Sequence, residues 1–324
     1  MKNAVISSTG SYLPETIIHN EELTQFPQAS KMIISQKTGV FARRSAAEDE
    51  CTSDLAVKSA RNCLEKIGFP AEKIEGIIVS TSSPDRIQPA TATRVQHMLG
   101  AGNAFAFDIN SVCSGSTFGI SLADALIKTG QYNNILFIAS EVYSRILNKK
   151  DFSTYPFFGD GSGAIFFQAG NSSGVLHSCL RTDGSGAETI CVPGGGSMMP
   201  YEKIKHPKFA FFKMNGKKVF NFAVSKGTEI ILQLIEEAGV SLKDIRCFVC
   251  HQANVNIILK IAEKIDVSPD NFYMNLFRYG NTASASVPIA LDEAISKGVI
   301  SKGDLAVTAA FGGGLSWGAN LIEI

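Results

Sequence analysis

The fold is decided by the stretch 103-NAFAFDINSVCSGSTFGISLADALIKTG-130, in which an apolar run gives way to a helical pattern. Residues 103–112 read as a strand and residues 113–130 as a helix, with Gly130 as its C-terminal cap. Cys113 stands at the junction, where a helix dipole favours the thiolate and predicts a lowered pKa. Cys113 is therefore either an acyl-accepting nucleophile or a small buried cysteine in a tight helix–strand contact.

Two later segments repeat this arrangement. His251 follows the short apolar run 244–250 and precedes a helical pattern, and Asn281 follows Gly280 before another. Taken singly, a histidine after a strand is usually a hydrogen-bonded structural residue, and an asparagine after glycine is usually a turn residue. Polar groups at three strand-to-helix junctions can, however, converge at the carboxyl edge of a sheet, where α/β folds bind ligands. The combination favours one cleft lined by these two residues and Cys113.

The composition is that of a globular protein with ample core-forming residues. The 324 residues are 45% hydrophobic, and 30 basic residues balance 30 acidic ones, which argues against binding to nucleic acid or an acidic membrane. No apolar run approaches the roughly 20 residues of a membrane-spanning helix, and the N-terminus lacks signal-peptide features. The seven cysteines are irregularly spaced, and we expect Cys247 and Cys250 on opposite faces of one strand. A reduced, cytoplasmic protein without a metal site follows.

The chain contains a weak internal repeat. Each half has a charged lead-in followed by an apolar strand, then a helix end, a turn and a buried strand, and finally a glycine-rich turn into an apolar strand. The matched pairs are 72–83 with 243–254, 126–141 with 294–310, and 158–168 with 311–324. This repeated order of elements predicts a duplicated α/β unit with a boundary near residues 170–174, giving halves 1–172 and 173–324. The cleft would lie at the junction of the halves.

Six motifs resemble those of the β-ketoacyl synthase III family of thiolase-fold condensing enzymes, in the same order and over nearly the whole chain. They are 10-GSYLPE-15, 108-DINSVCSGSTFGI-120, 158-FGDGSGA-164, 251-HQAN-254, 280-GNTASASVP-288 and 311-FGGGLSWG-318. The resemblance implies an α/β thiolase-like fold, with duplicated halves stacked in five layers (αβαβα), and a homodimer.

The resemblance also assigns roles to the three junction residues. Cys113 would be acylated by a thioester primer, and His251 and Asn281 would donate hydrogen bonds to the enolate formed when malonyl-acyl carrier protein loses carbon dioxide. The backbone N–H groups of Cys113 and Gly314 would form the oxyanion hole. Further substrate contacts are implied for Asn254, Phe311, Gly312 and Gly313. The substrates would be thioesters of coenzyme A or phosphopantetheine, and no cofactor is implied.

Several substrate-handling positions depart from the family pattern. Ile33 and Lys37 stand where members usually carry a tryptophan and an arginine, and Phe152 and Asn256 stand where further arginines grip the nucleotide of coenzyme A. These changes remove an aromatic stack and phosphate-pairing guanidinium groups. We therefore expect weak recognition of coenzyme A, with an acyl carrier protein delivering the primer instead.

Gln88 replaces an aromatic residue that usually reaches across the dimer to close the partner's acyl pocket. This replacement predicts a longer, polar or functionalised primer, unless a neighbour such as Ile87 closes the pocket.

The segment 202–220 contains six lysines and one acidic residue, Glu202. The lysines are Lys203, Lys205, Lys208, Lys213, Lys217 and Lys218. Such a basic patch suits the acidic surface of an acyl carrier protein, although a run of charges can also be a merely solvated face.

The intact Cys–His–Asn set favours an acyltransferase that performs decarboxylative Claisen condensation, in fatty-acid initiation or a related specialised lipid or polyketide pathway. Two alternatives stay open: a ketosynthase III-like transferase to an oxygen or nitrogen acceptor, and a non-catalytic subunit that binds acyl carrier protein.

Overall fold

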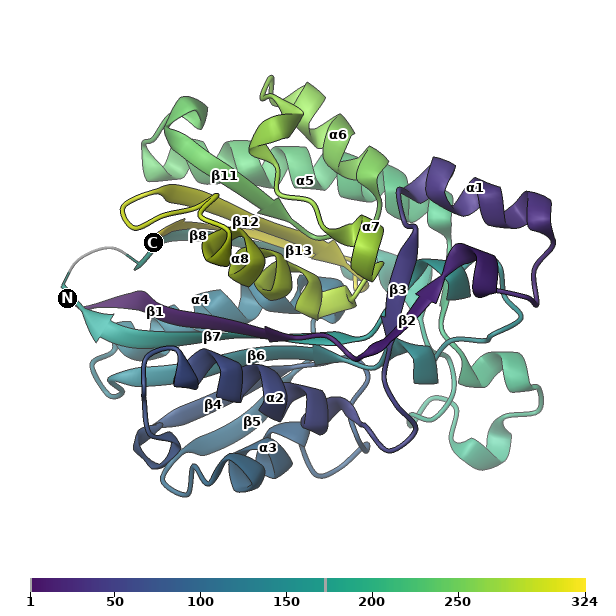
Figure 1. Ribbon diagram of the computed structural model, residues 1–324, viewed down its shortest axis with the longest axis horizontal. Helices are drawn as coiled ribbons and strands as arrows, with labels where there is room; N and C mark the ends of the chain where they lie inside the picture. The colour runs from purple at the N-terminus through teal and green to yellow at the C-terminus, as the bar shows by residue number, and fades with distance from the viewer. Residues whose placement is uncertain (1, 172–173) are drawn as a thin grey trace.

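The computed structural model describes residues 2–171 and 174–324, which form two central sheets (Figure 1). The first sheet has the strand order β1 (Asn3–Tyr12), β7 (Gly161–Gly170), β6 (Asn134–Glu141), β4 (Gly76–Ser80) and β5 (Phe105–Ile109). The second has the order β11 (Ile245–Cys250), β12 (Leu305–Gly312), β13 (Ser316–Glu323) and β8 (Gly174–Thr182). Strands β4 and β6 are buried along their whole length, as their nearly continuous apolar sequences require.

Helices cover both outer faces and fill the space between the sheets (Figure 1). The outer layers are α2 (Thr52–Glu65) with α3 (Thr91–Leu99), and α5 (Gly216–Ala238) with α6 (Val255–Lys264); the middle layer is α4 (Gly115–Lys128) with α8 (Ser286–Ser296). The remaining elements are α1 (Gln28–Thr38), α7 (Leu276–Tyr279), the pair β2 (Thr16–His19) and β3 (Ala42–Ser45), and the pair β9 (Ile190–Cys191) and β10 (Lys213–Met214). Among the described helices, none has the length and apolar character needed to cross a bilayer.

The two sheets repeat one pairing scheme. In the first, β4 runs parallel to β6, which is antiparallel to β7, which is antiparallel to β1. In the second, β11, β12, β13 and β8 follow the same sequence of directions. An isolated parallel bridge between Phe248 and Phe272 stands beside β11 where β5 stands beside β4. The predicted duplicated α/β architecture in five layers is confirmed.

The apolar core is divided by the sheets. One cluster lies between the two sheets around α4 and α8, a second lies under α2 and α3, and a third lies under α5 and α6. Cys247 belongs to the central cluster and Cys250 to the cluster under α5 and α6, so these two cysteines do occupy opposite faces of β11.

The chain passes from the first sheet to the second between Gly170 and Gly174. The predicted boundary at residues 172–173 lies outside the described residues, and the division into halves 1–172 and 173–324 stays a prediction. The halves share their middle layer, because α8 of the second packs on β7 and β1 of the first.

Candidate active site

Cys113 lies in a short 3-10 turn, Val112–Ser114, that joins β5 to α4. The helix begins at Gly115, so the thiol stands just ahead of it. Val112 has a left-handed backbone with φ of 47°, which is rare for a β-branched residue. Gly130 follows the helix with φ of 76°, and its N–H bonds back to the last turn at 2.9 Å, as expected of a C-terminal cap.

A cavity of about 270 Å³ is lined by Cys113, His251 and Asn281 together. They reach it from the turn before α4, the end of β11 and the segment before α8 respectively. Its walls are largely apolar and include Phe157, Phe158, Ile190, Phe212, Val219 and Phe220. The structure therefore brings the three junction residues to one largely apolar cavity.

His251 is held through both its backbone and its ring. Its backbone N–H bonds to the C=O of Ala309 at 2.8 Å, and Phe311 packs edge-on with ring centres 5.7 Å apart. Nδ1 lies 2.7 Å from the hydroxyl oxygen of Ser286, which also accepts the N–H of Gln252 at 3.3 Å. Burial lowers the pKa of His251 to about 3, so the ring is neutral at physiological pH.

Asn281 is held by the main chain of the first half. Its N–H bonds to the C=O of Phe157 at 2.8 Å, and its C=O accepts the N–H of Gly159 at 3.0 Å. Its Oδ1 accepts the N–H of Ala283 at 2.8 Å, which leaves the NH2 group to donate to a ligand. Gly280 is needed before it, because φ is 67° and a Cβ there would lie 2.9 Å from the C=O of Phe157.

The lowered pKa predicted for Cys113 is wrong. The residue is only 6% exposed among aromatic and aliphatic side chains, and this burial raises the pKa of the thiol. The negative charge of Glu141 raises it further. The resting site therefore holds a thiol, since a nearby helix terminus does not outweigh desolvation and a buried carboxylate.

Glu141, the last residue of β6, was not predicted as part of this site. It is fully buried, and its carboxylate accepts hydrogen bonds from the hydroxyls of Ser83 at 2.6 Å and Ser284 at 2.7 Å and from the N–H of Ser82 at 3.1 Å. Burial raises the pKa of Glu141, while these hydrogen bonds favour its charged form. The available signal was an acidic residue two positions after the apolar run 135–139.

Gly312 brings β12 against the turn that carries Cys113. A Cβ at this position would lie 2.8 Å from the backbone nitrogen of Cys113 and 3.0 Å from its Cβ, closer than packed atoms approach. Gly313 and Gly314 form the following turn and are not among the described residues that line the cavity. The oxyanion hole expected at Cys113 and Gly314 stays a prediction.

The comparisons with known proteins agree with this geometry. A family model described as 3-oxoacyl-[acyl-carrier-protein (ACP)] synthase III matches residues 107–184, and the model of its C-terminal part matches residues 235–324. The beta-ketoacyl-[acyl-carrier-protein] synthase III of Clostridium acetobutylicum is 39% identical over 323 residues, covering 100% of this chain and 99% of the relative. The chain belongs to the β-ketoacyl-[acyl-carrier-protein] synthase III family.

Solved structures show the same likeness. The 3-oxoacyl-[acyl-carrier-protein] synthase III of Aquifex aeolicus has a TM-score of 0.91 at 34% identity and covers 100% of both chains. The priming β-ketosynthase of the R1128 polyketide pathway has a TM-score of 0.93 at 28% identity, covering 99% of this chain and 96% of that one. This chain is thus an enzyme of the ketosynthase III type with a thiolase fold, a transferase that condenses an acyl primer with a malonyl unit.

Four of the expected substrate-binding residues of this ketosynthase III line the cavity: Lys37, Asn254, Phe311 and Gly312. Lys37 is exposed in the last turn of α1. Asn254 caps α6, its Oδ1 accepting the N–H of Asn256 at 2.8 Å. These residues belong to the rim and wall of one pocket.

The remaining expected substrate residues lie away from the lining of that cavity, as far as the described chain extends. Phe152 packs edge-on against Phe26 with ring centres 5.2 Å apart, and Ile33 is half-buried on α1. The side-chain amide of Asn256 donates to the C=O of Lys37 at 2.8 Å, which ties α6 to α1. Phe152 and Asn256, two of the positions expected to contact the nucleotide, thus have structural partners here.

Gln88 lies on the exposed loop between β4 and α3, and its neighbour Ile87 is 72% exposed. The structure of one chain leaves both side chains open to solvent, and which of them closes a partner's pocket stays a prediction.

All six lysines of the basic segment are exposed. Lys203, Lys205, Lys208 and Lys213 lie between β9 and α5, and Lys217 and Lys218 lie in the first turn of α5. That same turn provides Gly216, Val219 and Phe220 to the cavity wall. The last two lysines therefore lie next to residues of the cavity wall.

Proposed function

We propose that Cys113 carries the acyl group between the primer thioester and the malonyl unit. Its sulfur attacks the thioester carbonyl, and the S–H proton goes to the departing thiol, so this exchange needs no permanent base. The malonyl unit then loses carbon dioxide, and the carbanion left behind forms the carbon–carbon bond to the acyl carbon. Cys113 leaves as a thiolate and takes up one proton.

The observation that carries this proposal is a pair of neutral hydrogen-bond donors facing a buried thiol. We assign the ring proton of His251 to Nε2, with the hydroxyl of Ser286 donating to Nδ1 while its oxygen accepts the N–H of Gln252. The amide of Asn281 presents its NH2 group, because Oδ1 is engaged. Two such donors stabilise a developing enolate oxygen without protonating it, which is what decarboxylation requires.

The tetrahedral oxyanion of the acyl-transfer steps fits on the other side of the sulfur. Close approach of Gly312 places the glycine-rich turn beside the backbone of Cys113. We assign the oxyanion to the N–H of Cys113 and an N–H of this turn, with Gly314 as the expected partner.

Positive charge beside the cavity wall supports primer delivery by an acyl carrier protein. Lys217 and Lys218 occupy the first turn of α5, where the helix dipole disfavours positive charge. They weaken their own helix and gain a role if an acidic partner docks there. A phosphopantetheine arm needs no nucleotide contacts, which agrees with the structural use made of Phe152 and Asn256.

Two further expectations rest on indirect support. Strand β5 is an edge of the first sheet and pairs, in the described chain, with β4 alone, which supports the expected homodimer. All seven cysteines are free, which supports the expected reducing, cytoplasmic setting.

The proposal is tested by intact-mass measurement after incubation with an acyl-acyl carrier protein. The wild type should gain one acyl group and lose it, with release of carbon dioxide, when malonyl-acyl carrier protein is added. Cys113→Ser should gain none, whereas Cys250→Ser, a buried cysteine beside His251 that faces the outer core, should behave as the wild type. An adduct on Cys113→Ser would refute the nucleophile, and loss of the acyl group to an alcohol or amine without carbon dioxide would show O- or N-acyl transfer.

A further inference from the structure

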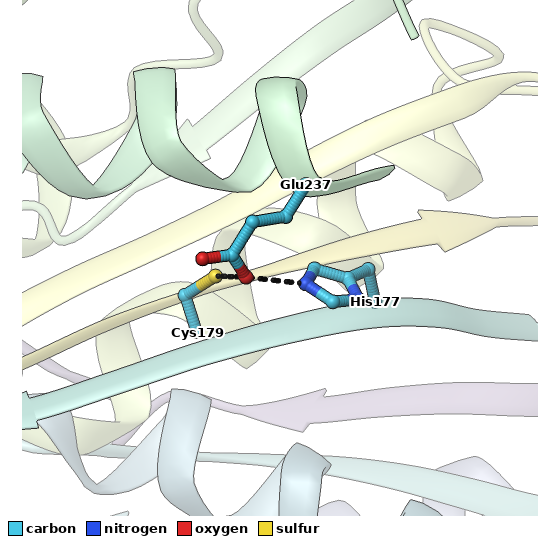
Figure 2. Close-up of side chains that lie close together, drawn as sticks. All are labelled: His177, Cys179 and Glu237. Carbon is cyan, nitrogen blue, oxygen red and sulfur yellow. Dashed lines mark hydrogen bonds and ion pairs between the residues drawn. The ribbon is translucent and has the colours of Figure 1, made fainter. Parts of the chain in front are cut away.

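A second cluster of reactive side chains, none of which lines the active-site cavity, lies between β8 and α5. Its members are His177 and Cys179 on β8 and Glu237 in the last turn of α5. Figure 2 shows the three side chains pointing at one another, with the carboxylate in the middle. The ligand atoms of all three lie within 4.8 Å of one another.

The sequence explains why these side chains meet. His177 and Cys179 are two residues apart, so both project from the same face of β8. That face packs against α5, which carries Glu237, a residue 58 positions after Cys179 in the chain. The Oε2 atom of Glu237 lies 2.8 Å from Nε2 of His177 and 3.2 Å from Sγ of Cys179.

We propose that His177, Cys179 and Glu237 form a binding site for a divalent cation of the zinc class. Sulfur, imidazole nitrogen and carboxylate oxygen are the three ligand types that Zn²⁺ takes from proteins, whereas Mg²⁺ and Ca²⁺ prefer oxygen alone. One thiolate and one carboxylate balance the charge of the ion. Binding breaks the S–H bond of Cys179, forms a metal–sulfur bond and releases one proton to solvent.

The geometry needs little adjustment to hold the ion. Metal–ligand distances of about 2.0–2.3 Å place the ligand atoms of a tetrahedral site roughly 3.3–3.6 Å apart. The two hydrogen-bonded distances to Glu237 are slightly shorter than this, and the histidine nitrogen and the cysteine sulfur lie within 4.8 Å of each other, so rotations of the side chains are enough to admit the ion. His177 and Glu237 are partly open to solvent, with side-chain exposures of 35% and 43%, so water can complete the coordination.

The carboxylate is already oriented for this purpose. The amide nitrogen of Gln233, one turn earlier on α5, donates to Oε1 of Glu237 at 2.6 Å. This bond leaves Oε2 directed at the histidine and the cysteine. Hydrogen bonds of this kind, from outside the ligand set, hold metal-binding carboxylates in place.

Other chemistry fits the cluster less well. In a catalytic triad the imidazole stands between the nucleophile and the carboxylate, whereas here the carboxylate stands in the middle. The prediction of no metal site considered cysteine spacing alone and did not anticipate a carboxylate from α5.

The test uses the full chain, stripped by a chelator, kept reduced with a phosphine and titrated with Co²⁺ and then Zn²⁺. We expect one equivalent of Co²⁺ with thiolate-to-cobalt charge-transfer absorption, displaced by Zn²⁺. Cys179→Ser should abolish the absorption. His177→Gln, at a partly exposed position, should weaken binding too, and it is the variant to measure if Cys179→Ser does not fold. Gln233→Ala should weaken Zn²⁺ binding by about 10–100-fold, the usual effect of losing a partner outside the ligand set.

Two matched controls separate this site from other thiols. Cys113→Ser removes the catalytic sulfur, and Cys191→Ser removes a sulfur that lies 3.9 Å from the carboxylate of Glu188 without a histidine. Both should bind one equivalent as the wild type does. At about 100 times its Kd, Zn²⁺ should raise the Tm of the wild type by several degrees and leave that of Cys179→Ser unchanged. Equal binding by Cys179→Ser, or loss of the absorption in Cys113→Ser, would overturn the proposal.

Discussion

At the scale of single residues, the segment 280-GNTASASVP-288 fixes three different parts of the active site. Asn281 presents its amide, Ser284 donates to the carboxylate of Glu141, and Ser286 bonds to the ring of His251. The small residues between them allow close packing, since Ala283 and Ala285 are fully buried. A motif that looks like a polar turn is therefore the scaffold of the donor pair.

The donor pair leads to a prediction about rates. His251→Ala and Asn281→Ala should each slow decarboxylation of malonyl-acyl carrier protein by about 10²–10³-fold, because each removes one donor to the enolate oxygen. Acylation of Cys113 should stay largely intact, because that step does not form the enolate. Carbon dioxide release measures the first effect and intact mass the second. Wild-type decarboxylation by both variants would contradict the assigned roles.

Burial of His251 predicts acid-sensitive stability. Its pKa is about 3 in the folded chain but near the ordinary 6.5 when unfolded. As pH falls below 6.5, the unfolded chain binds a proton that the folded chain does not, so stability falls by up to about 1.4 kcal/mol per pH unit. Denaturant unfolding from pH 7 to pH 4 should therefore show the free energy of unfolding falling less steeply in His251→Gln. The exposed control His97→Gln should follow the wild type; parallel curves for all three would contradict this.

At the scale of elements, the duplication extends to backbone strain. Val112 precedes α4 with φ of 47°, and Ala283 precedes α8 with φ of 46°. Each lies in a 3-10 turn at the start of a middle-layer helix, and the two turns carry Cys113 and the partner of Asn281. Strained turns at equivalent places in both halves fit a functional requirement, because they aim the two groups into one cavity.

The strain at Val112 can be measured by substitution. Val112→Gly relieves a cost of about 1–3 kcal/mol and adds about 0.5–1 kcal/mol of backbone entropy cost, so the free energy of unfolding should stay level or rise. Acylation of Cys113 should slow, because the turn becomes looser. Val142→Gly is the control: with φ of −118° and 3% exposure, it should destabilise by about 2 kcal/mol or more. Equal destabilisation by both variants would show that Val112 is not strained.

At the scale of the whole molecule, the repeat and the junction residues were predictable because they depend on local patterns. The strand over 103–112 is found as β5 and the helix over 113–130 as α4, each within a few residues. Features that depend on distant contacts were not predictable. Glu141 raises the pKa of Cys113 from another strand, and Phe152 turns inward to a phenylalanine 126 residues earlier. Sequence neighbours cannot report either contact.

The molecule as a whole has no net charge, so it can attract a charged partner only through a local cluster of charged side chains. The six lysines of the segment 203–218 provide that patch, and the last two adjoin the cavity through Gly216 and Val219. We expect acyl-acyl carrier protein to acylate Cys113 faster than the matching acyl-coenzyme A. The advantage should shrink as salt rises toward 1 M, where the Debye length falls to about 3 Å.

Reversal of charge gives the sharpest form of this prediction. Lys217→Glu with Lys218→Glu should slow acylation by the carrier protein by about 10-fold or more, since electrostatic steering raises association rates by roughly 10–10³-fold. The same variant should leave the reaction with acyl-coenzyme A nearly unchanged, because the chain has lost most of its expected nucleotide contacts. Lys260→Glu with Lys264→Glu, on α6 away from the patch, makes the same change in net charge and should have little effect. Acylation rates should be followed by intact mass at low and high salt. Salt-insensitive acylation, or equal slowing by both double variants, would mean that Lys217 and Lys218 do not guide the carrier protein.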